Sequence, residues 1–323
     1  MPDAALSDRR EFLARLAWAP LLLFSRRPRQ ALRPAASPAP PRLVVIHGSD
    51  VDRMLGAGLE RLGGLEAIVR GRRVALKPNA TAPQPYPVTT DVELLRYLVR
   101  RVRNAGAASI AITDAPSFAG LAAQRVFAEL GYVGLGRDAG VDVVAVDPTL
   151  GSEFVRVASS RWEAHPFVRT CRRVNEADVV INLAIPKRHH VADFSCGLKN
   201  HFGCTSDTFR MLAHIRGGAF FDRSVVEFAD AVRPELTIVD ARRVLTRAGP
   251  TIRPGQSEIR DAGQMVLSAD VVAVDAWCAD LMQRLDASFR KATRVTAQLE
   301  YAERLGLGQS RPGSVELVQA EVA

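Results

Sequence analysis

Residues able to do chemistry are concentrated in one stretch of the chain, residues 185–204. The stretch follows an apolar run over residues 179–183, which is typical of a buried strand. In open α/β sheets ligands bind beyond the carboxyl ends of the strands, so a dense polar segment at such an exit indicates a site. The side chains concerned are Lys187, Arg188, His189, His190, Asp193, Cys196, Lys199, Asn200, His201 and Cys204.

This chain has few lysines and many arginines, so the lysines in or near residues 185–204 are candidates for a functional role. A lysine is a point charge for phosphate or carboxylate and, when desolvated, a nucleophile. Lys199, held between apolar Leu198 and Phe202, is a predicted catalytic residue together with His190. For Lys187 a solvated surface position is the simpler expectation. The set predicted to bind a cofactor or anion is Lys77, Asn79, Lys187 and Asn200.

Histidine and aspartate side chains supply a predicted metal site. Neutral imidazole is the commonest protein nitrogen ligand for zinc, nickel or iron. The adjacent pair His189 and His190 cannot simply chelate one ion, because neighbouring side chains point in different directions. The alternatives are a structural, hydrogen-bonded histidine and aspartates that cap the helix after a strand. The predicted metal ligands are His190, Asp114, Asp240 and His214, with the identity of the metal left open.

The cysteines bear on redox chemistry. They are Cys171, Cys196, Cys204 and Cys278, and no two are spaced as C-x-x-C. Because ferredoxin-type spacing is absent, we expect no iron-sulfur cluster within this chain. Cys196 and Cys204 are open to two interpretations, a disulfide formed after export or two buried thiols, and we favour buried thiols.

Strand and helix patterns alternate along the chain, which predicts an α/β fold with a mostly parallel sheet flanked by helices. The clearest helix begins at a capping box of Thr90 and Glu93 and ends at Gly106. We expect a single main domain over residues 43–285 and a polar helical tail over 286–323. Strands are predicted at 43–46, 73–76, 109–113, 141–146, 179–183, 236–239 and 265–267, and helices at 51–61, 117–130 and 270–285. The residues predicted to share one rim of the sheet are Lys77, Asn79, Asp114, Asp147, Lys187, His190 and Asp240.

Several pieces of sequence together resemble the DUF362 family over about residues 74–282. They include LKPN at 76–79, ITDAP at 112–116 and SADVVAVDA at 268–276. The most specific piece is Pro186, Lys187 and His190 followed by Leu198, Lys199, Asn200 and Gly203. That family carries no settled activity, so the resemblance implies a fold more than a reaction. Its frequent ferredoxin module is missing here, which leaves a separate redox partner as one expectation.

A second resemblance is to the nickel-pincer lactate racemases. In that family a histidine is followed by a Gly/Ala-rich turn with a lysine and then by a later histidine. Here His190, Gly197 with Lys199, and His214 fall in that order. The family's histidine touches nickel and its lysine secures the cofactor, so the resemblance implies a racemase-like enzyme with a metal cofactor.

The first 42 residues are predicted to be a twin-arginine-type leader and linker. SDRREFL at 7–13 resembles the export motif, with Arg9 and Arg10 as the pair, and the apolar residues 16–24 have the length of a signal-peptide core. Residues 25–41, rich in Pro, Arg and Ala, form the linker. We expect the twin-arginine export machinery as a partner and a periplasmic location, with retention at the membrane if the leader stays uncleaved. The alternative is a disordered basic arm.

The charge distribution and the missing motifs argue against several classes of function. Residues 1–42 hold eight arginines against three acids, which accounts for five of the net charge of +8, and no nucleic-acid-binding pattern occurs. We therefore expect no nucleic-acid partner. Hydrolase, zincin, NTPase and Rossmann motifs are also missing. Two hypotheses remain: an exported enzyme, redox or racemase-like, that binds a metal or a small anionic ligand or cofactor, and a non-catalytic periplasmic protein that binds a metal or anion.

Overall fold

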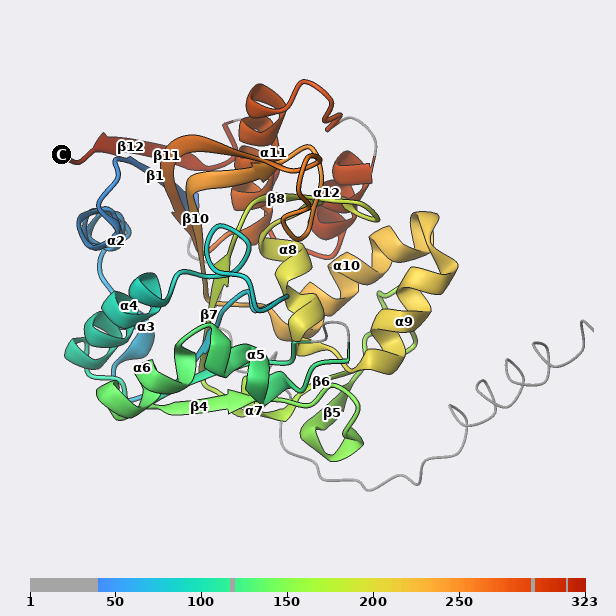
Figure 1. Cartoon of the computed structure of the whole chain (residues 1–323), viewed down its shortest axis with the longest axis horizontal. Helices are drawn as coiled ribbons and strands as arrows, with labels where there is room; N and C mark the ends of the chain where they lie inside the picture. Colours follow the sequence, from blue (N-terminus) through green and yellow to red (C-terminus); the bar gives the residue numbers. More distant parts are fainter. Residues whose placement is uncertain (1–39, 117–119, 292–293, 312) are drawn as a thin grey trace, which may run out of the picture. The chain divides into compact units, whose positions relative to one another are not determined.

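One large sheet carries the fold in the computed structural model, which describes residues 40–116, 120–291, 294–311 and 313–323 (Figure 1). Its main path runs β12-β1-β11-β10-β7-β2-β3-β4. Every neighbouring pair on this path is parallel except the two that β11 makes, so the predicted mostly parallel sheet is confirmed. These strands are β1 (Arg42–His47), β2 (Arg73–Lys77), β3 (Ser109–Asp114), β4 (Asp142–Ala145), β7 (Val179–Ala184), β10 (Leu236–Thr246), β11 (Glu258–Ser268) and β12 (Glu316–Glu321).

Four short strands of the described residues lie off this path. β8 (Lys187–His189) and β9 (Asp193–Ser195) form an antiparallel hairpin directly after β7, and Lys187 of β8 pairs with Leu245 of β10. β5 (Phe154–Val157) and β6 (Val168–Cys171) make a separate antiparallel pair. The hairpin was not predicted from the sequence. It folds the polar stretch back over the end of the sheet.

Helices cover both faces of the sheet. They are α2 (Val51–Arg61), α3 (Glu66–Val69), α4 (Val92–Asn104), α5 (Ala123–Glu129), α6 (Tyr132–Ala139), α7 (Arg172–Glu176), α8 (Gly197–Asn200), α9 (Asp207–Arg216), α10 (Gly218–Val232), α11 (Val271–Leu285) and α12 (Arg294–Arg304), with 3-10 turns η2 (Gly151–Glu153) and η3 (His201–Cys204). Side chains alternate along a strand. Each strand thus contributes side chains to both faces of the sheet. On one face Leu76 and Ile112 pack with α2, α4 and α6, and on the other face Val239 and Val266 pack with α10, α11 and α12.

The start of α4 differs from the predicted capping box. Asp91 is the cap, because its carboxylate accepts a hydrogen bond from the backbone N–H of Glu93 at 3.0 Å. The hydroxyl of Thr90 instead accepts from the N–H of Asn79 at 2.8 Å and donates to the carbonyl of Leu183 at 3.1 Å. Thr90 therefore ties the loop after β2 to the end of β7. The helix predicted over 117–130 begins only at Ala123, and residues 117–119 lie outside the described residues.

The segment 286–323 differs from the predicted polar helical tail. Within it Phe289, Leu299 and Tyr301 are buried in the main core. Its last strand, β12, pairs in parallel with β1 along all six residues. A strand edge presents unpaired backbone groups, and β12 satisfies those of β1. This segment is part of the domain that the sequence placed at 43–285.

The predicted leader falls almost wholly outside the described residues, since description begins at residue 40. Within the described part of the chain, no helix has both the length and the apolar character needed to cross a bilayer.

Candidate functional site

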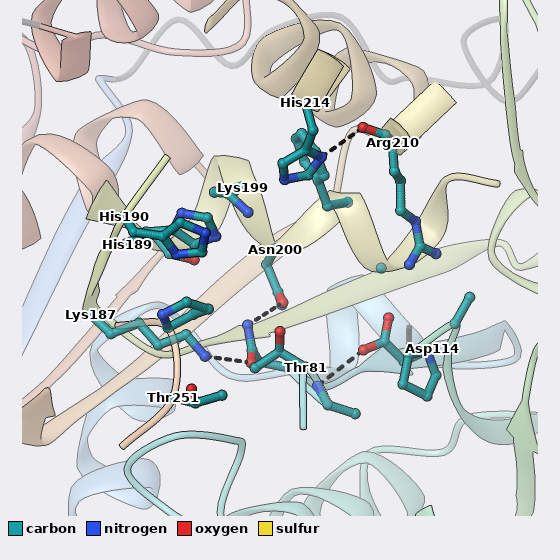
Figure 2. Close-up of a pocket in the computed structure, with 18 of the residues that line it drawn as sticks. Thr81, Asp114, Lys187, His189, His190, Lys199, Asn200, Arg210, His214 and Thr251 are labelled. Atoms are coloured by element: carbon teal, nitrogen blue, oxygen red, sulfur yellow. Dashed lines mark hydrogen bonds between the residues drawn. The ribbon is translucent and has the colours of Figure 1, made fainter. Parts of the chain in front are cut away.

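A cavity of about 490 Å³ lies at the carboxyl ends of β2, β3 and β7 (Figure 2). Its walls come from segments far apart in the sequence: the loop after β2, the end of β3, the β8–β9 hairpin, α8, α9 and the loop after β10. The lining residues with polar or charged side chains are Asn79, Thr81, Asp114, Lys187, His189, His190, Ser195, Lys199, Asn200, Asp207, Arg210, His214, Thr251 and Arg253. Most of the predicted site residues are therefore brought together.

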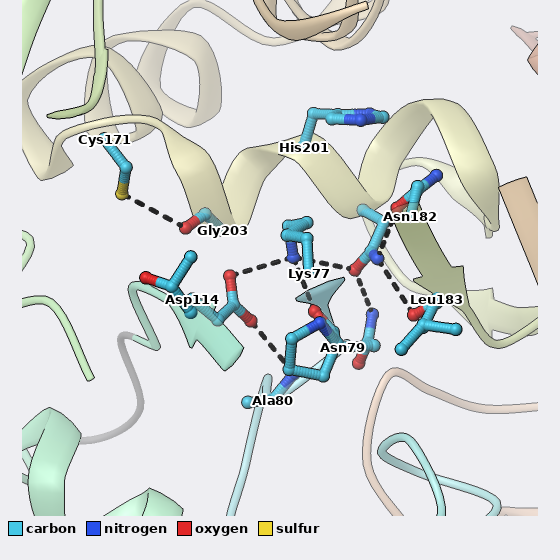
Figure 3. Close-up of polar contacts among 12 residues, drawn as sticks. Lys77, Asn79, Ala80, Asp114, Cys171, Asn182, Leu183, His201 and Gly203 are labelled. Carbon is cyan, nitrogen blue, oxygen red and sulfur yellow. Dashed lines mark hydrogen bonds and ion pairs between the residues drawn. The ribbon is translucent and has the colours of Figure 1, made fainter. Parts of the chain in front are cut away.

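The floor of the cavity is a buried ion pair between Lys77 and Asp114 (Figure 3). Lys77 Nζ lies 2.8 Å from Asp114 Oδ1, 2.6 Å from the carbonyl of Pro78 and 3.2 Å from Asn200 Oδ1. The ammonium group therefore donates two hydrogen bonds, to Pro78 and Asn200, and its charge is compensated by the carboxylate of Asp114. Lys77 is fully buried and lies beneath the cavity lining, so its role is to position neighbouring groups.

An amide network joins this floor to the walls. Asn200 donates to Asn182 Oδ1 at 2.8 Å and to the carbonyl of Leu183 at 3.1 Å, and its own Oδ1 accepts from Asn79 at 3.0 Å. Asn79 in turn accepts from Lys187 Nζ at 2.9 Å. The predicted binding residues Asn79 and Asn200 thus hold α8, the loop after β2 and β8 in one arrangement. Both line the cavity.

Lys187 is not the solvated surface lysine that the sequence favoured. Only 1% of it is exposed, and its Nζ donates to Asn79 Oδ1 and to the carbonyl of Val88. Burial, with the nearby charges of Lys199 and Lys77, lowers the pKa of Lys187 well below its ordinary value of 10.5. Its acceptors come from the loop after β2, which no local pattern around Lys187 could reveal.

Lys199 and Arg210 present groups to the cavity that lack acceptors. Across the described residues, Lys199 Nζ has no hydrogen bond or ion pair, and it lies 4.3 Å from the ring centre of Phe202. Burial lowers the pKa of Lys199 to about 7, with the charge of Arg210 as a smaller cause. Arg210 is 8% exposed; its Nε donates to Thr205, yet its buried Nη2 has no hydrogen-bond partner in the described part of the chain.

Three histidines line the same cavity with fixed tautomers. His189 Nδ1 accepts two backbone N–H groups, from Val191 and Ala192, so its ring proton is on Nε2. His190 stacks on His189 with ring centres 5.0 Å apart and lies 3.2 Å from the carbonyl of Gly249 through Nδ1. A carbonyl only accepts, so Nδ1 of His190 carries the proton. His214 does the same toward the carbonyl of Arg210 at 2.7 Å.

The predicted metal ligands do not assemble into one set. Asp240 is absent from the cavity lining; it accepts from Tyr86 at 2.9 Å and pairs with Arg242 at 2.7 Å. Its strand, β10, is three positions from β3 in the sheet, so the strands that carry Asp240 and Asp114 are about 14 Å apart. Asp114 is itself committed to Lys77. No group of three or more His, Cys, Asp or Glu side chains in a metal-binding arrangement occurs among the described residues.

The sequence analysis did not identify Arg210 as a site residue, and it chose His190 over His189 as the predicted metal ligand. Arg210 and His214 are four residues apart on α9, so they share a face of that helix, and this spacing was the available signal. The four cysteines are buried thiols outside any disulfide, which agrees with the favoured interpretation of Cys196 and Cys204. Lys199, His190 and His214 lie on one cavity, as Figure 2 shows.

Comparisons with known proteins identify the family and the relatives that this chain resembles. Residues 74–280 match the model of a family described as a domain of unknown function, DUF362. A relative, a thylakoid-associated protein from Synechocystis sp., is 31% identical over 265 residues, which cover 80% of this chain and 75% of the relative. Among solved structures, the lactate racemase apoprotein from Thermoanaerobacterium thermosaccharolyticum aligns with a TM-score of 0.47 and 15% identity. That alignment covers 68% of this chain and 54% of the other chain.

Proposed function

The chain belongs to the DUF362 family, a domain of unknown function, and we propose that it binds a small anionic ligand in the cavity at the end of the sheet. One observation carries the proposal. Arg210 Nη2 and Lys199 Nζ both belong to the cavity lining, and neither has a hydrogen-bond acceptor among the described residues. Arg210 is buried and Lys199 is half-buried, so leaving their donors without acceptors is costly, and an anion supplies the acceptors.

The carboxylates of the cavity support the same ligand class. Asp114 is neutralised by Lys77 at 2.8 Å, and Asp207 lies 3.8 Å from Arg210 Nη1. The lining therefore offers positive charge without an unpaired carboxylate to repel an anion. A volume of about 490 Å³ suits a small molecule rather than a polymer. Guanidinium and ammonium groups together favour a carboxylate or a phosphate.

Anion binding is expected to be coupled to protonation. Burial lowers the pKa of Lys199 to about 7, so this lysine changes charge near neutral pH. A bound anion favours the ammonium form and raises that pKa again. The affinity for an anion should therefore fall as pH rises through about 7, while Arg210 keeps its charge throughout.

Calorimetric titration with sodium phosphate, lactate and pyruvate tests the proposal. Arg210→Met should weaken binding by about tenfold or more, since a hydrogen bond to a charged group contributes about 1.5–3 kcal/mol. Arg216→Met is the matched control, because it removes the same charge from the same helix at a position outside the cavity lining. Equal effects of the two variants, or no binding of any probe by the parent, would overturn the proposal.

We also propose that the ligand is bound outside the cytoplasm, after export of the folded protein by the twin-arginine route. The support is the sequence pattern of Arg9, Arg10, Phe12 and Leu13. Between the enzyme and the non-catalytic binding protein, Lys199 favours the enzyme. A group whose pKa is about 7 both accepts and donates protons at neutral pH, which is the requirement for acid-base catalysis.

A further inference from the structure

The chain has only four lysines, and their surroundings differ sharply. Lys77 is paired with Asp114, Lys187 donates to Asn79 and Val88, and Lys291 lies 2.6 Å from Asp280. Lys199 is the exception: within the described ranges its Nζ meets only aromatic rings and the cavity. A lysine that merely stabilised the fold would be expected to have an acceptor, as the other three do.

The surroundings of Lys199 are those of a nucleophilic amine. Its Nζ lies 4.3 Å from the ring centre of Phe202 and 5.9 Å from that of Phe221, so one side of the amine is apolar. The other side belongs to the cavity, which Arg210 also lines. An apolar pocket and a neighbouring cation both disfavour the ammonium form, and its pKa falls to about 7. A large fraction of Lys199 is therefore a neutral amine at neutral pH.

We propose that Lys199 forms a reversible imine with the carbonyl carbon of a small oxo compound whose carboxylate or phosphate is held by Arg210. This inference rests on the proposed anion binding and adds the reacting group and the ligand class. Figure 2 places Lys199 between the stacked rings of His189 and His190 on one side and the ring of His214 on the other, above the space that the ligand would fill.

The step balances without any oxidant or reductant. The nitrogen lone pair attacks the carbonyl carbon, and one amine proton passes to the carbonyl oxygen, which gives a carbinolamine. Loss of the second amine proton and departure of the hydroxyl as water then form the C=N bond. His214 serves as the proton acceptor and donor, because burial lowers its pKa and its Nδ1–H is committed to Arg210, which leaves Nε2 as a free base.

Reductive trapping of the full-length folded protein tests the imine. The protein is incubated with pyruvate, or with dihydroxyacetone phosphate, in the presence of sodium cyanoborohydride, and the modified lysines are located by peptide mass spectrometry. We expect an adduct on Lys199 with at least one of the two probes, and the responding probe separates carboxylate from phosphate ligands. The other three lysines serve as internal controls and should stay unmodified. Lactate, which has no carbonyl group, should give no adduct.

Substitutions of single lysines and the pH dependence of the yield test whether the adduct forms through the amine of Lys199. Lys199→Arg should abolish the adduct, whereas Lys291→Arg, a lysine outside the cavity, should leave the yield at Lys199 unchanged. With the probe at a saturating concentration the yield should rise with pH to a half-maximum above 7, because the bound anion raises the Lys199 pKa from its ligand-free value of about 7. Absence of any Lys199 adduct, or equal labelling of all four lysines, overturns the imine. Calorimetry with lactate and phosphate separates the two proposals: binding without trapping overturns the imine alone, and neither binding nor trapping overturns both.

Discussion

Gly203 packs against the buried ion pair of Lys77 and Asp114, where a side chain does not fit. An added Cβ would overlap Asp114 Oδ1 and come within 2.9 Å of Lys77 Nζ. Neither partner can move away without leaving a buried charge poorly paired. We expect Gly203→Ala to lower the free energy of unfolding by about 3 kcal/mol, measured by urea denaturation.

Gly134, inside α6, is the control for that substitution. Nothing lies within 4 Å of a Cβ added there, and alanine is favoured over glycine in a helix interior by about 1 kcal/mol. Gly134→Ala should therefore leave stability unchanged or slightly higher. Equal losses in the two variants would contradict the packing explanation for Gly203.

Lys199 also predicts a pH dependence of stability. Its pKa is about 7 in the folded protein against an ordinary value of 10.5, so between these values the unfolded chain binds more protons. The contribution of Lys199 to stability therefore rises with pH across this window and is lost as pH falls toward 7. Lys199→Met should remove that rise, in denaturation measured at several pH values. Lys291→Met should follow the parent, and a parent slope kept by Lys199→Met would refute the burial of this amine.

Individual residues show which features of the site could be predicted from the sequence and which could not. Lys199 and His190 were selected from residue type and their place after a strand, and His214 from the order of residues in the racemase resemblance, and all three line the cavity. Burial of Lys187 depends on acceptors in a distant loop, so its local sequence could not predict it. Asp240 has the sequence context of a strand-end ligand, but Arg242, two residues later, turns back to pair with it.

Among the elements, α8 is the short helix that carries Lys199 and Asn200 into the site. Asp275 of α11 holds its first turn: the carboxylate accepts from the backbone N–H groups of Gly197 at 2.6 Å and Leu198 at 3.0 Å. Asp275→Ala leaves both groups buried and unpaired, which costs about 1–3 kcal/mol each. We expect the variant to lose stability by about 3 kcal/mol and to bind anions more weakly, as read by denaturation and calorimetry.

Asp280, on the same helix, supplies the comparison for Asp275. Its side chain is 53% exposed and its partner is Lys291. An exposed ion pair contributes at most about 1 kcal/mol, so Asp280→Ala should have little effect on stability and none on anion binding. If Asp275→Ala kept full anion affinity, α8 would not depend on α11 for its position.

Hydrophobic periodicity predicted the helices and strands that have a regular apolar pattern. It missed the elements whose position depends on contacts with distant parts of the chain. The alternation of apolar runs with helical spacing identified β2, α4, β3 and β7 to within a few residues. The β8–β9 hairpin has only three residues in each strand, too few for a period to be visible. β12 was read as part of a helical tail, because its place beside β1 depends on the far end of the chain.

The whole molecule combines a parallel sheet with one antiparallel strand, and this topology explains the position of the site. The carboxyl ends of β2, β3 and β7 are adjacent, so Asn79, Asp114 and Lys187 meet above them. β10 lies on the other side of β7 from β2 and β3, and Asp240 lies within that strand and not at its end, so Asp240 is absent from the cavity lining. Strand order, which the sequence does not state, therefore decided which rim residues share a site.

Export is the prediction that belongs to the scale of the whole molecule. The predicted leader contains Arg9 and Arg10 within SDRREFL, followed by a short apolar segment, and the twin-arginine export machinery recognises such an arginine pair. Arg9→Lys with Arg10→Lys keeps the charge but removes the recognised side chains, so the double variant should remain in the cytoplasm when cell fractions are probed by immunoblot. Arg26→Lys with Arg27→Lys makes the same chemical change outside the motif and should be exported like the parent. Both double variants reaching the periplasm equally would show that the paired arginines are not the signal, and the N-terminal segment would then be a basic arm.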